Sequence, residues 1–227
     1  MNKSELNSNF LNNLQFNNEG LIPAIAQDHL DGAILMMAWM NQISIERTIN
    51  TGFVHYWSRS RSELWLKGNT SGNKQILKEI KFDCDADTIL LKIDQTGSGA
   101  CHKGYRSCFF NSYDHEAGHI LKSFDITSDT CSEVFKIIER RKNTPEKGSY
   151  TNSLLEGGTN KILKKIGEES AEFVMSCKDN DTSEIANEAA DLIFHLQVAL
   201  SSQGVSWREV LKVLESRKGA PRRHRND

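Results

Sequence analysis

The chain has 227 residues, 38% of them hydrophobic and 26% charged, which is enough apolar material for one large or two small folded domains and excludes a disordered tract. A formal net charge of −2 argues against a surface built to bind nucleic acid. The longest apolar run, 33–40, is too short to span a bilayer, and the Asn-rich start lacks the basic flank of a secretory signal. We expect a cytoplasmic protein with no nucleic-acid or membrane partner, whose five cysteines are free thiols or metal ligands.

The first half of the chain, up to about residue 111, has the pattern of a β protein. Short apolar segments alternate with turn signals such as Asp31-Gly32 and Ser71-Gly72. We predict a short helix over 40–51, and strands over 75–82 and 88–94, where apolar residues alternate with Lys and Asp. The first domain is therefore placed at 1–111 and is predicted to be mainly β.

The second half, from about residue 129, has helical periodicity. Thr130 and Glu133 have capping-box spacing at the start of the first predicted helix. Further helices are predicted over about 152–177, over 181–202, and from Ser206 to Gly219. We interpret 112–128 as a linker and 129–227 as an all-α helical bundle. A basic tail, interpreted as a solvated terminus, contains Arg217, Lys218, Arg222, Arg223 and Arg225.

Cysteines and aspartates form the densest group of potential metal ligands in the first half. Because thiolates suit zinc and carboxylates suit magnesium, we expect two metals. The candidate ligands are Cys84, Cys101 and Cys108 for Zn²⁺, and Asp83, Asp85 and Asp87 for Mg²⁺. If 83–87 is extended, its aspartates point one way and Cys84 the other. The alternative is that the cysteines are packing residues and the aspartates a solvated turn.

Three protein ligands leave the fourth position of zinc for water, which is typical of a catalytic site with a zinc-activated hydroxide as nucleophile. Three thiolates acidify such a water less than neutral histidines do, so we expect a nearby general base. Our candidate is His102, next to Cys101, with Asp85 or His55 as second choices.

A basic segment rich in Trp, Ser and Gly lies upstream, over 57–73. Its side chains and backbone offer donors for phosphate, and its Trp faces could stack on a base. The candidate substrate contacts are Arg59, Arg61, Lys67, Thr70 and Ser71. The alternative is an ordinary charged hairpin.

Four stretches, DGAILMMAWMN, HYWSRSRSELWLKGNTSGN, DCDAD and ACHKGYRSCF, together resemble phosphoribosyl-AMP cyclohydrolase over about 20–111. The resemblance implies a barrel-like β fold, zinc on the three cysteines, magnesium on the three aspartates, and hydrolytic opening of the adenine ring between N1 and C6. It also implies a homodimer with sites near the subunit interface.

Carboxylates recur at helical spacing in the second half. They are Glu168, Glu169, Glu172, Glu188 and Asp191. Two packed antiparallel helices would bring them together, and oxygen ligands at this density suit Mg²⁺ holding a substrate's phosphates. The alternative is the solvated side of a helix, but Glu188 and Asp191 interrupt an Ala- and Leu-rich segment that has the composition of a buried helix.

This carboxylate pattern resembles the all-α nucleoside-triphosphate pyrophosphohydrolases that include MazG-like enzymes, and SYTNSLLEGGTNKILKKIGEESAE narrows it to phosphoribosyl-ATP pyrophosphohydrolase over about 130–219. The resemblance implies attack of water at the α-phosphorus, with Glu169 as candidate base. Basic residues that could neutralise the polyphosphate are Lys161, Lys165, Lys164 and Arg141.

Together the two halves predict a bifunctional hydrolase of histidine biosynthesis, in which the product of the second domain is the substrate of the first. Two alternatives stay open. One is a general nucleotide house-cleaning pyrophosphohydrolase with a structural metal module, and the other is a zinc-containing nucleic-acid-binding protein. Cys131 and Cys177 are interpreted as packing residues.

Overall fold

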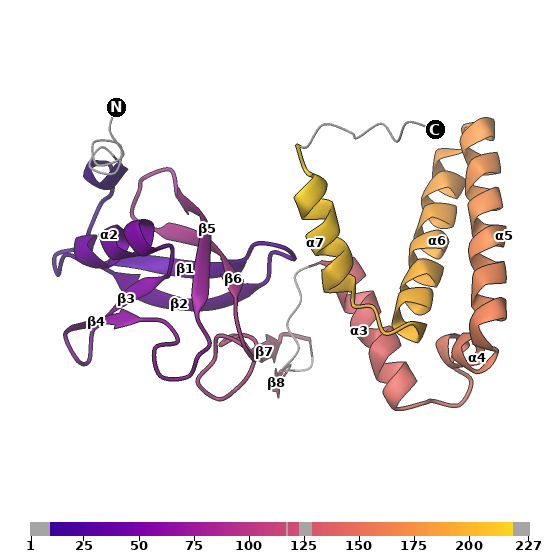
Figure 1. Ribbon diagram of the computed structural model, residues 1–227, viewed down its shortest axis with the longest axis horizontal. Coiled ribbons are helices and arrows are strands. Elements are labelled where there is room, and N and C mark those ends of the chain that lie inside the picture. The colour runs from indigo at the N-terminus through magenta and orange to yellow at the C-terminus, as the bar shows by residue number, and fades with distance from the viewer. Residues whose placement is uncertain (1–9, 117, 123–128, 220–227) are drawn as a thin grey trace. The chain divides into compact units, whose positions relative to one another are not determined.

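The computed structural model describes residues 10–116, 118–122 and 129–219. The chain divides into two compact units, Met1–Ser128 and Asp129–Asp227, which are described separately (Figure 1). Within the described ranges, no helix has both the length and the apolar character needed to cross a bilayer. The last three arginines of the basic tail, at 222, 223 and 225, lie outside them.

The first unit is built on a six-stranded sheet with strand order β4-β3-β2-β1-β6-β5. Its strands are β1 (Ile22–Asp28), β2 (Ile34–Met40), β3 (His55–Ser58), β4 (Glu63–Leu66), β5 (Gln75–Phe82) and β6 (Ile89–Gln95). Neighbours are antiparallel except β1 and β6, which run parallel. The helix α2 (Gln42–Thr51) connects β2 to β3. The predicted helix and the two predicted strands are confirmed to within two residues.

The sheet curls so that its β5 edge meets the segment before β3. Phe53 forms a bridge with Ile76, and the Val54 amide donates to the carbonyl of Gln75 at 2.9 Å. Along β1, buried residues alternate with partly exposed ones. The Tyr56 hydroxyl donates to Gln75 Oε1 at 2.7 Å, which joins β3 to the start of β5. The mainly β, barrel-like domain is therefore confirmed.

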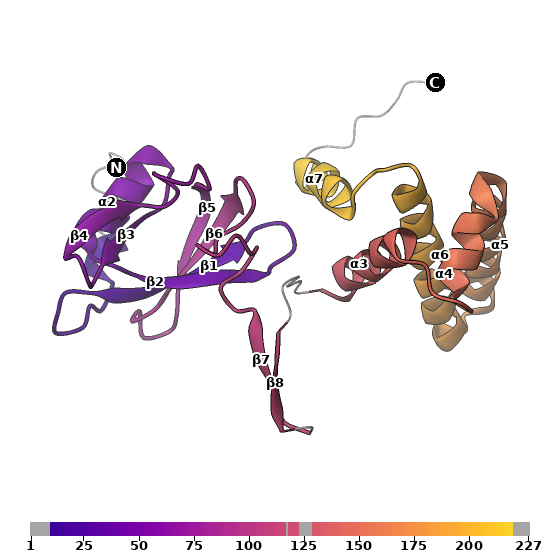
Figure 2. The same cartoon turned by 90° about the horizontal axis from the view of Figure 1, so that it is seen from below.

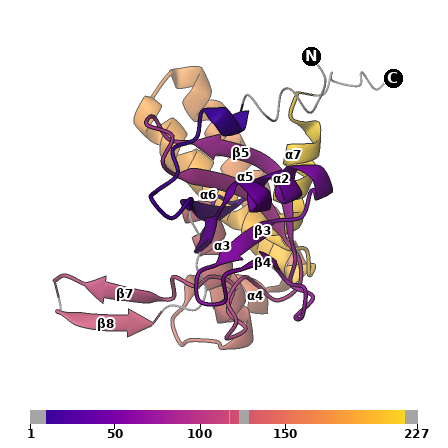
Figure 3. The ribbon, with the colours of Figure 1, turned by 90° about the vertical axis from the view of Figure 1, so that its left-hand side faces the viewer.

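Two segments of this unit differ from the sequence prediction. Residues 83–87 form a turn, with the Ala86 amide donating to the Asp83 carbonyl and Ala86 at a φ of 60°, and are not extended. A hairpin that sequence reasoning did not predict, of β7 (Asn111–Asp114) and β8 (His119–Lys122), begins at the end of the predicted first domain and continues into the predicted linker. Figures 2 and 3 show this hairpin as a two-stranded ribbon separate from the six-stranded sheet. Residues 123–128 of the linker lie outside the described ranges.

The second unit is helical, as predicted. Its helices are α3 (Thr130–Asn143), α4 (Tyr150–Glu156), α5 (Gly158–Asp179), α6 (Thr182–Ser202) and α7 (Trp207–Arg217). Helices α5 and α6 run side by side in opposite directions (Figure 1), and a small core of Ile138, Leu154, Ile162 and Val198 joins α3, α4, α5 and α6. This unit thus forms an antiparallel pair of long helices with shorter helices packed against it.

Helix boundaries differ from the prediction at two places. The single helix predicted over 152–177 is two helices, because Gly158 adopts a left-handed φ of 74° that interrupts the helical path. The cap of α3 is Asp129, whose side chain accepts from the Ser132 amide at 2.9 Å, so the predicted Thr130–Glu133 capping box is wrong. The helix predicted from Ser206 is confirmed as α7, and Ser206 and Glu209 form a capping box at its start.

Candidate functional site

One pocket of the β domain lies between the β4–β5 connection and the loop that follows β6. The pocket has a volume of about 280 Å³ and lies between Lys67 to Asn73 on one side and Cys101 to Gly104 on the other. Its lining includes the predicted substrate residues Lys67, Thr70 and Ser71, and the candidate base His102. A basic, hydroxyl-rich wall therefore faces a thiol and an imidazole across a cavity large enough for part of a nucleotide.

Two of the three predicted zinc ligands, Cys101 and Cys108, are neighbours, and Cys101 lines this pocket. Partial burial, with the adjacent Cys101 thiol, raises the pKa of Cys108 to about 11. Lys67 is buried and donates through Nζ to the carbonyl of Ala100 at 2.8 Å. Burial lowers the pKa of Lys67, and the two nearby thiols act in the opposite direction. The donor set of two adjacent thiols fits zinc, and Lys67 contacts the cysteine loop directly.

Cys84 lies elsewhere on the sheet. It is exposed in the turn after β5, whereas Ala100 is held through Lys67 and Val54 to the start of β5 at Gln75. The eight residues of β5 separate the two positions, by on the order of 20 Å at about 3.3 Å per residue. Within the described residues, the three cysteines do not form a group of potential ligand atoms.

The three aspartates beside Cys84 do come together. One oxygen of each of Asp83, Asp85 and Asp87 lies within 4.8 Å of the others, all three side chains being exposed. Burial acts to raise the pKa of Asp83, but hydrogen bonds from Thr88 outweigh it and hold that pKa below its usual value. The group is produced by the turn, and it is an oxygen-only donor set that fits Mg²⁺.

The remaining candidates of the β domain are not among the residues that line the pocket. Arg59 lies over the ring of Trp39, 4.8 Å from its centroid, and Arg61 pairs with the exposed Glu63 at 2.6 Å. His55 is buried, with Nδ1 2.8 Å from the Phe53 carbonyl, and it lines no part of the pocket. Of the candidate bases, only His102 lies beside a predicted zinc ligand and the cavity.

In the helical domain, Glu169 and Glu172 on α5 meet Glu188 on α6. One carboxylate oxygen of each lies within 4.8 Å of the other two, and Glu169 is 6% exposed. Partial burial, followed by the charges of Glu172 and Glu169, raises the pKa of Glu188. Crowded carboxylates that are costly to ionise together are the donor set expected for a divalent cation.

Other predicted residues of this domain lie around these three carboxylates. Glu168 pairs with Lys165 at 2.9 Å, and this hydrogen bond lowers its pKa. Asp191 is one helical turn beyond Glu188 and is not among the three converging carboxylates. The Lys161 ammonium donates to the Ser153 carbonyl at 2.9 Å, and Arg141 pairs with Glu146. The lysines are therefore already engaged by the chain itself.

Sequence reasoning did not assign a role to Tyr150 or His195. The ring of His195 is buried, with Nε2 3.0 Å from the Tyr150 hydroxyl and Nδ1 2.8 Å from the Asp191 carbonyl. Nδ1 also lies 3.9 Å from Glu169 Oε1. The signal in the sequence was spacing, because His195 follows Asp191 by four residues and so shares its helix face.

Comparison with known proteins matches each domain to a separate family. Residues 36–110 match the model of phosphoribosyl-AMP cyclohydrolase, and residues 131–218 match that of phosphoribosyl-ATP pyrophosphohydrolase. The chain is 61% identical over 215 residues to the histidine biosynthesis bifunctional protein HisIE of Parasynechococcus marenigrum (strain WH8102), covering 95% of this chain and 97% of the relative.

Other relatives have the same description. HisIE of Prochlorococcus marinus (strain MIT 9313) is 62% identical over 95% of this chain and 97% of its own length. HisIE of Thermosynechococcus vestitus (strain NIES-2133 / IAM M-273 / BP-1) is 49% identical over 92% of this chain and 95% of its own length.

Fold, sites and matches together define a two-domain hydrolase of phosphoribosyl nucleotides. The chain belongs to the bifunctional family of histidine biosynthesis that joins phosphoribosyl-AMP cyclohydrolase to phosphoribosyl-ATP pyrophosphohydrolase. The cyclohydrolase match over the β domain favours this assignment over a house-cleaning enzyme with a structural metal module.

Proposed function

We propose that the two activities use the two sites described above, with zinc and magnesium as the metals. The helical domain releases pyrophosphate from phosphoribosyl-ATP at Glu169, Glu172 and Glu188, and the β domain opens the adenine ring beside Cys101 and Cys108. The observation that supports this most is the pocket in which Cys101 and His102 face Lys67, Thr70 and Ser71. We place both reactions in the reducing cytoplasm, where the five cysteines form no disulfides.

Zinc in this proposal is held by the thiols of two chains of a homodimer. Cys101 and Cys108 are adjacent, whereas Cys84 lies about a strand length away, on the order of 20 Å. In a twofold dimer, Cys84 of the partner subunit can approach the pair while this chain's Cys84 serves the second site. Bound zinc would supply an acidified water as nucleophile, and His102 is positioned to move protons at the ring being opened.

The aspartate group beside Cys84 is proposed to hold Mg²⁺ next to the same shared site. Lys67 in this proposal supports the cysteine loop through Ala100, while Thr70 and Ser71 are left to contact the phosphate. Arg59 and Arg61 have to leave Trp39 and Glu63 before either can bind substrate.

In the helical domain, bound Mg²⁺ would polarise the α–β phosphoanhydride. The carboxylate of Glu169 is the proposed base, because it is buried beside Lys165 and His195 and lies with the other two carboxylates. Lys165 and Lys161 would turn from their present partners toward the polyphosphate. Glu168 and Asp191 are proposed to join the metal shell as the substrate binds.

Complementation tests the shared zinc site. Cys84→Ser and Cys101→Ala chains are each expected to lose ring opening and bound zinc, while Cys177→Ser, which changes an exposed thiol outside the site, keeps both. When the two inactive chains are unfolded and refolded together, half the dimers are mixed and each has one intact site. About a quarter of the parent activity then returns if the interface is twofold. No recovery in mixtures shown to contain mixed dimers would refute sharing.

A further inference from the structure

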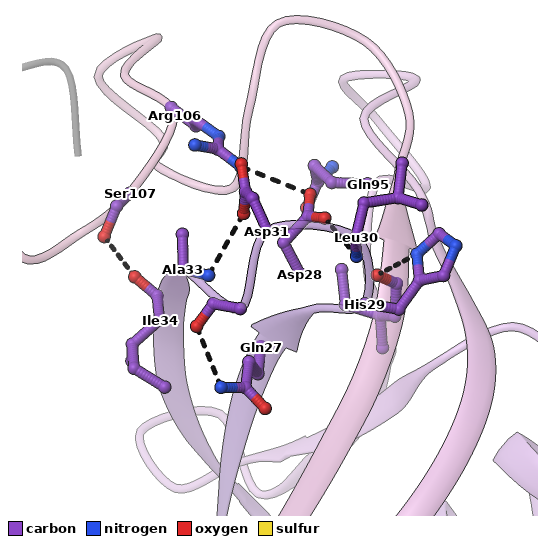
Figure 4. A network of polar contacts seen from close by, with 12 residues as sticks. Gln27, Asp28, His29, Leu30, Asp31, Ala33, Ile34, Gln95, Arg106 and Ser107 are labelled. Carbon is purple, nitrogen blue, oxygen red and sulfur yellow. Dashed lines mark hydrogen bonds and ion pairs between the residues drawn. The ribbon is translucent and has the colours of Figure 1, made fainter. Parts of the chain in front are cut away.

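Arg106 ties the loop that carries two proposed zinc ligands to the turn between β1 and β2. Its Nη2 lies 2.5 Å from Asp31 Oδ2 and 3.4 Å from Asp28 Oδ2 (Figure 4). The Asp28 side chain is 2% exposed and that of Asp31 9%, against 24% for Arg106. One guanidinium therefore pairs with two shielded carboxylates, an arrangement stronger than an exposed ion pair.

The β1–β2 turn itself holds both carboxylates through hydrogen bonds that do not involve Arg106. Asp28 Oδ1 accepts from the Leu30 amide at 3.0 Å, and Asp31 Oδ1 accepts from the Ala33 amide at 3.1 Å. Each carboxylate thus uses one oxygen for its own turn and presents the other to the guanidinium (Figure 4). Both carboxylates are therefore oriented by their own turn, and they can fix the position of the loop that carries Arg106.

The backbone around Arg106 sets the positions of both cysteines. The Arg106 carbonyl accepts from the Ala100 amide at 3.0 Å, one residue before Cys101. Two residues after Arg106, the Cys108 amide donates to the Leu35 carbonyl of β2 at 2.7 Å. The two backbone segments of this loop are closely packed, because a Cβ added at Gly99 would lie 2.4 Å from the Tyr105 carbonyl oxygen. Arg106 therefore lies in the segment whose backbone hydrogen bonds hold Cys108 and the residue before Cys101.

We propose that Arg106 is a positioning residue of the cyclohydrolase site, which holds the loop 101–108 against Asp31 and Asp28 so that Cys101 and Cys108 bind zinc together. This positioning role rests on the proposed zinc site. It adds to that site a residue that is neither a proposed zinc ligand nor a proposed substrate contact. Groups that orient metal ligands typically change metal affinity by about 10- to 100-fold when removed.

The test measures zinc affinity with a competing chromophoric chelator in Arg106→Gln and Arg106→Lys full-length dimers. Arg106→Gln removes the charge and leaves two carboxylates facing each other. Arg106→Lys keeps the charge but loses the planar fork, so we expect an intermediate effect. Arg47→Gln, at an exposed arginine of α2, is the matched control. Pyrophosphohydrolase activity of the same samples reports on the other domain.

We expect Arg106→Gln to bind zinc roughly 10- to 100-fold more weakly than the parent, and its ring opening to recover at saturating zinc. A purely structural role would lower the melting temperature without moving the zinc midpoint, and that result would overturn the proposal. If Arg106→Gln does not fold, Asp31→Asn decides, because its amide oxygen still accepts from Ala33 and Arg106 keeps Asp28.

Cys101→Ala separates failure of this proposal from failure of the zinc assignment. If Cys101→Ala loses zinc while Arg106→Gln and Asp31→Asn retain parent affinity, only the positioning role is refuted. If Cys101→Ala itself keeps bound zinc, the zinc assignment is wrong and the positioning role falls with it.

Discussion

The carboxylates of Glu169, Glu172 and Glu188 repel one another, and a bound cation would relieve this repulsion. The pKa of Glu188 is raised by partial burial and by the charges of Glu172 and Glu169, so its ionised form is disfavoured in the fold. A neutral side chain at this position removes the repulsion and also a proposed ligand. We therefore predict that Glu188→Gln is more stable than the parent without metal, yet gains less stability from Mg²⁺.

Thermal unfolding with and without Mg²⁺ checks this prediction. A cation at 100 times its dissociation constant adds about 2.7 kcal/mol to the parent. Glu215→Gln, on α7 and outside the three carboxylates, is expected to respond to Mg²⁺ as the parent does. An equal response of Glu188→Gln would remove Glu188 from the proposed metal shell.

Tyr150 contacts the buried Glu169 indirectly, through His195, whose Nδ1 lies 3.9 Å from Glu169 Oε1. Tyr150→Phe removes only the hydroxyl 3.0 Å from His195 Nε2 and leaves a buried ring nitrogen without that partner. We predict a loss of about 1 kcal/mol in stability of the helical domain, a higher Mg²⁺ midpoint for pyrophosphate release, and unchanged ring opening.

The matched control is Tyr113→Phe, the same change at an exposed tyrosine of β7 in the other domain. Stability is measured by denaturant unfolding and the midpoint by Mg²⁺ titration of pyrophosphate release. If Tyr150→Phe has the stability and the Mg²⁺ midpoint of the parent, the proposed support of Glu169 by Tyr150 and His195 is refuted.

At the scale of elements, α3 depends on its cap. The Asp129 side chain accepts from the Ser132 amide at 2.9 Å, and α3 packs against α6 through Ile138. Asp129→Ala is predicted to lower the unfolding free energy of the helical domain by about 1 kcal/mol. Asp179→Ala, near the end of α5 where a negative charge opposes the helix dipole, should leave stability unchanged or slightly raised. Equal stability of both variants by denaturant unfolding would contradict the capping role.

The sequence predicts a segment of the fold well when that segment's own residues determine its secondary structure. β5 was predicted at its observed bounds because its apolar residues and flanking turns are local signals. The hairpin of β7 and β8 was missed because its residues are mostly exposed and lack an apolar face. The break at Gly158 was missed although Gly157 and Gly158 form a pair of poor helix formers, because helix-favouring stretches on both sides were joined across the pair.

For the sites too, the sequence predicted what depends on residue type and local spacing, and it missed what depends on the fold. Residue types and spacing predicted the Asp83, Asp85 and Asp87 group, although a turn produces it and not strand alternation. Spacing could not show that Cys84 lies a strand length from Cys101, because Cys84 follows the end of β5, whereas the loop of Cys101 is tied to the start of β5 only in the folded chain. Nor could it show Arg106 with Asp31, since 75 residues separate them.

At the scale of the whole molecule, two unrelated folds carry consecutive steps. Removal of pyrophosphate from phosphoribosyl-ATP in the helical domain leaves phosphoribosyl-AMP, which is the substrate of the β domain, so the reactions run opposite to the chain order. Each domain has its own core and its own cluster of potential ligands. Damage to one site is therefore expected to spare the other.

The most direct measurement supplies phosphoribosyl-ATP with Mg²⁺ and Zn²⁺ to the parent, Cys101→Ala and Glu172→Ala proteins, and follows pyrophosphate, phosphoribosyl-AMP and the ring-opened product over time. The parent is predicted to yield pyrophosphate and ring-opened product. Cys101→Ala should release pyrophosphate at the parent rate and accumulate phosphoribosyl-AMP, whereas Glu172→Ala should open the ring only of added phosphoribosyl-AMP. Loss of both activities from either folded variant would contradict two separate sites on one chain.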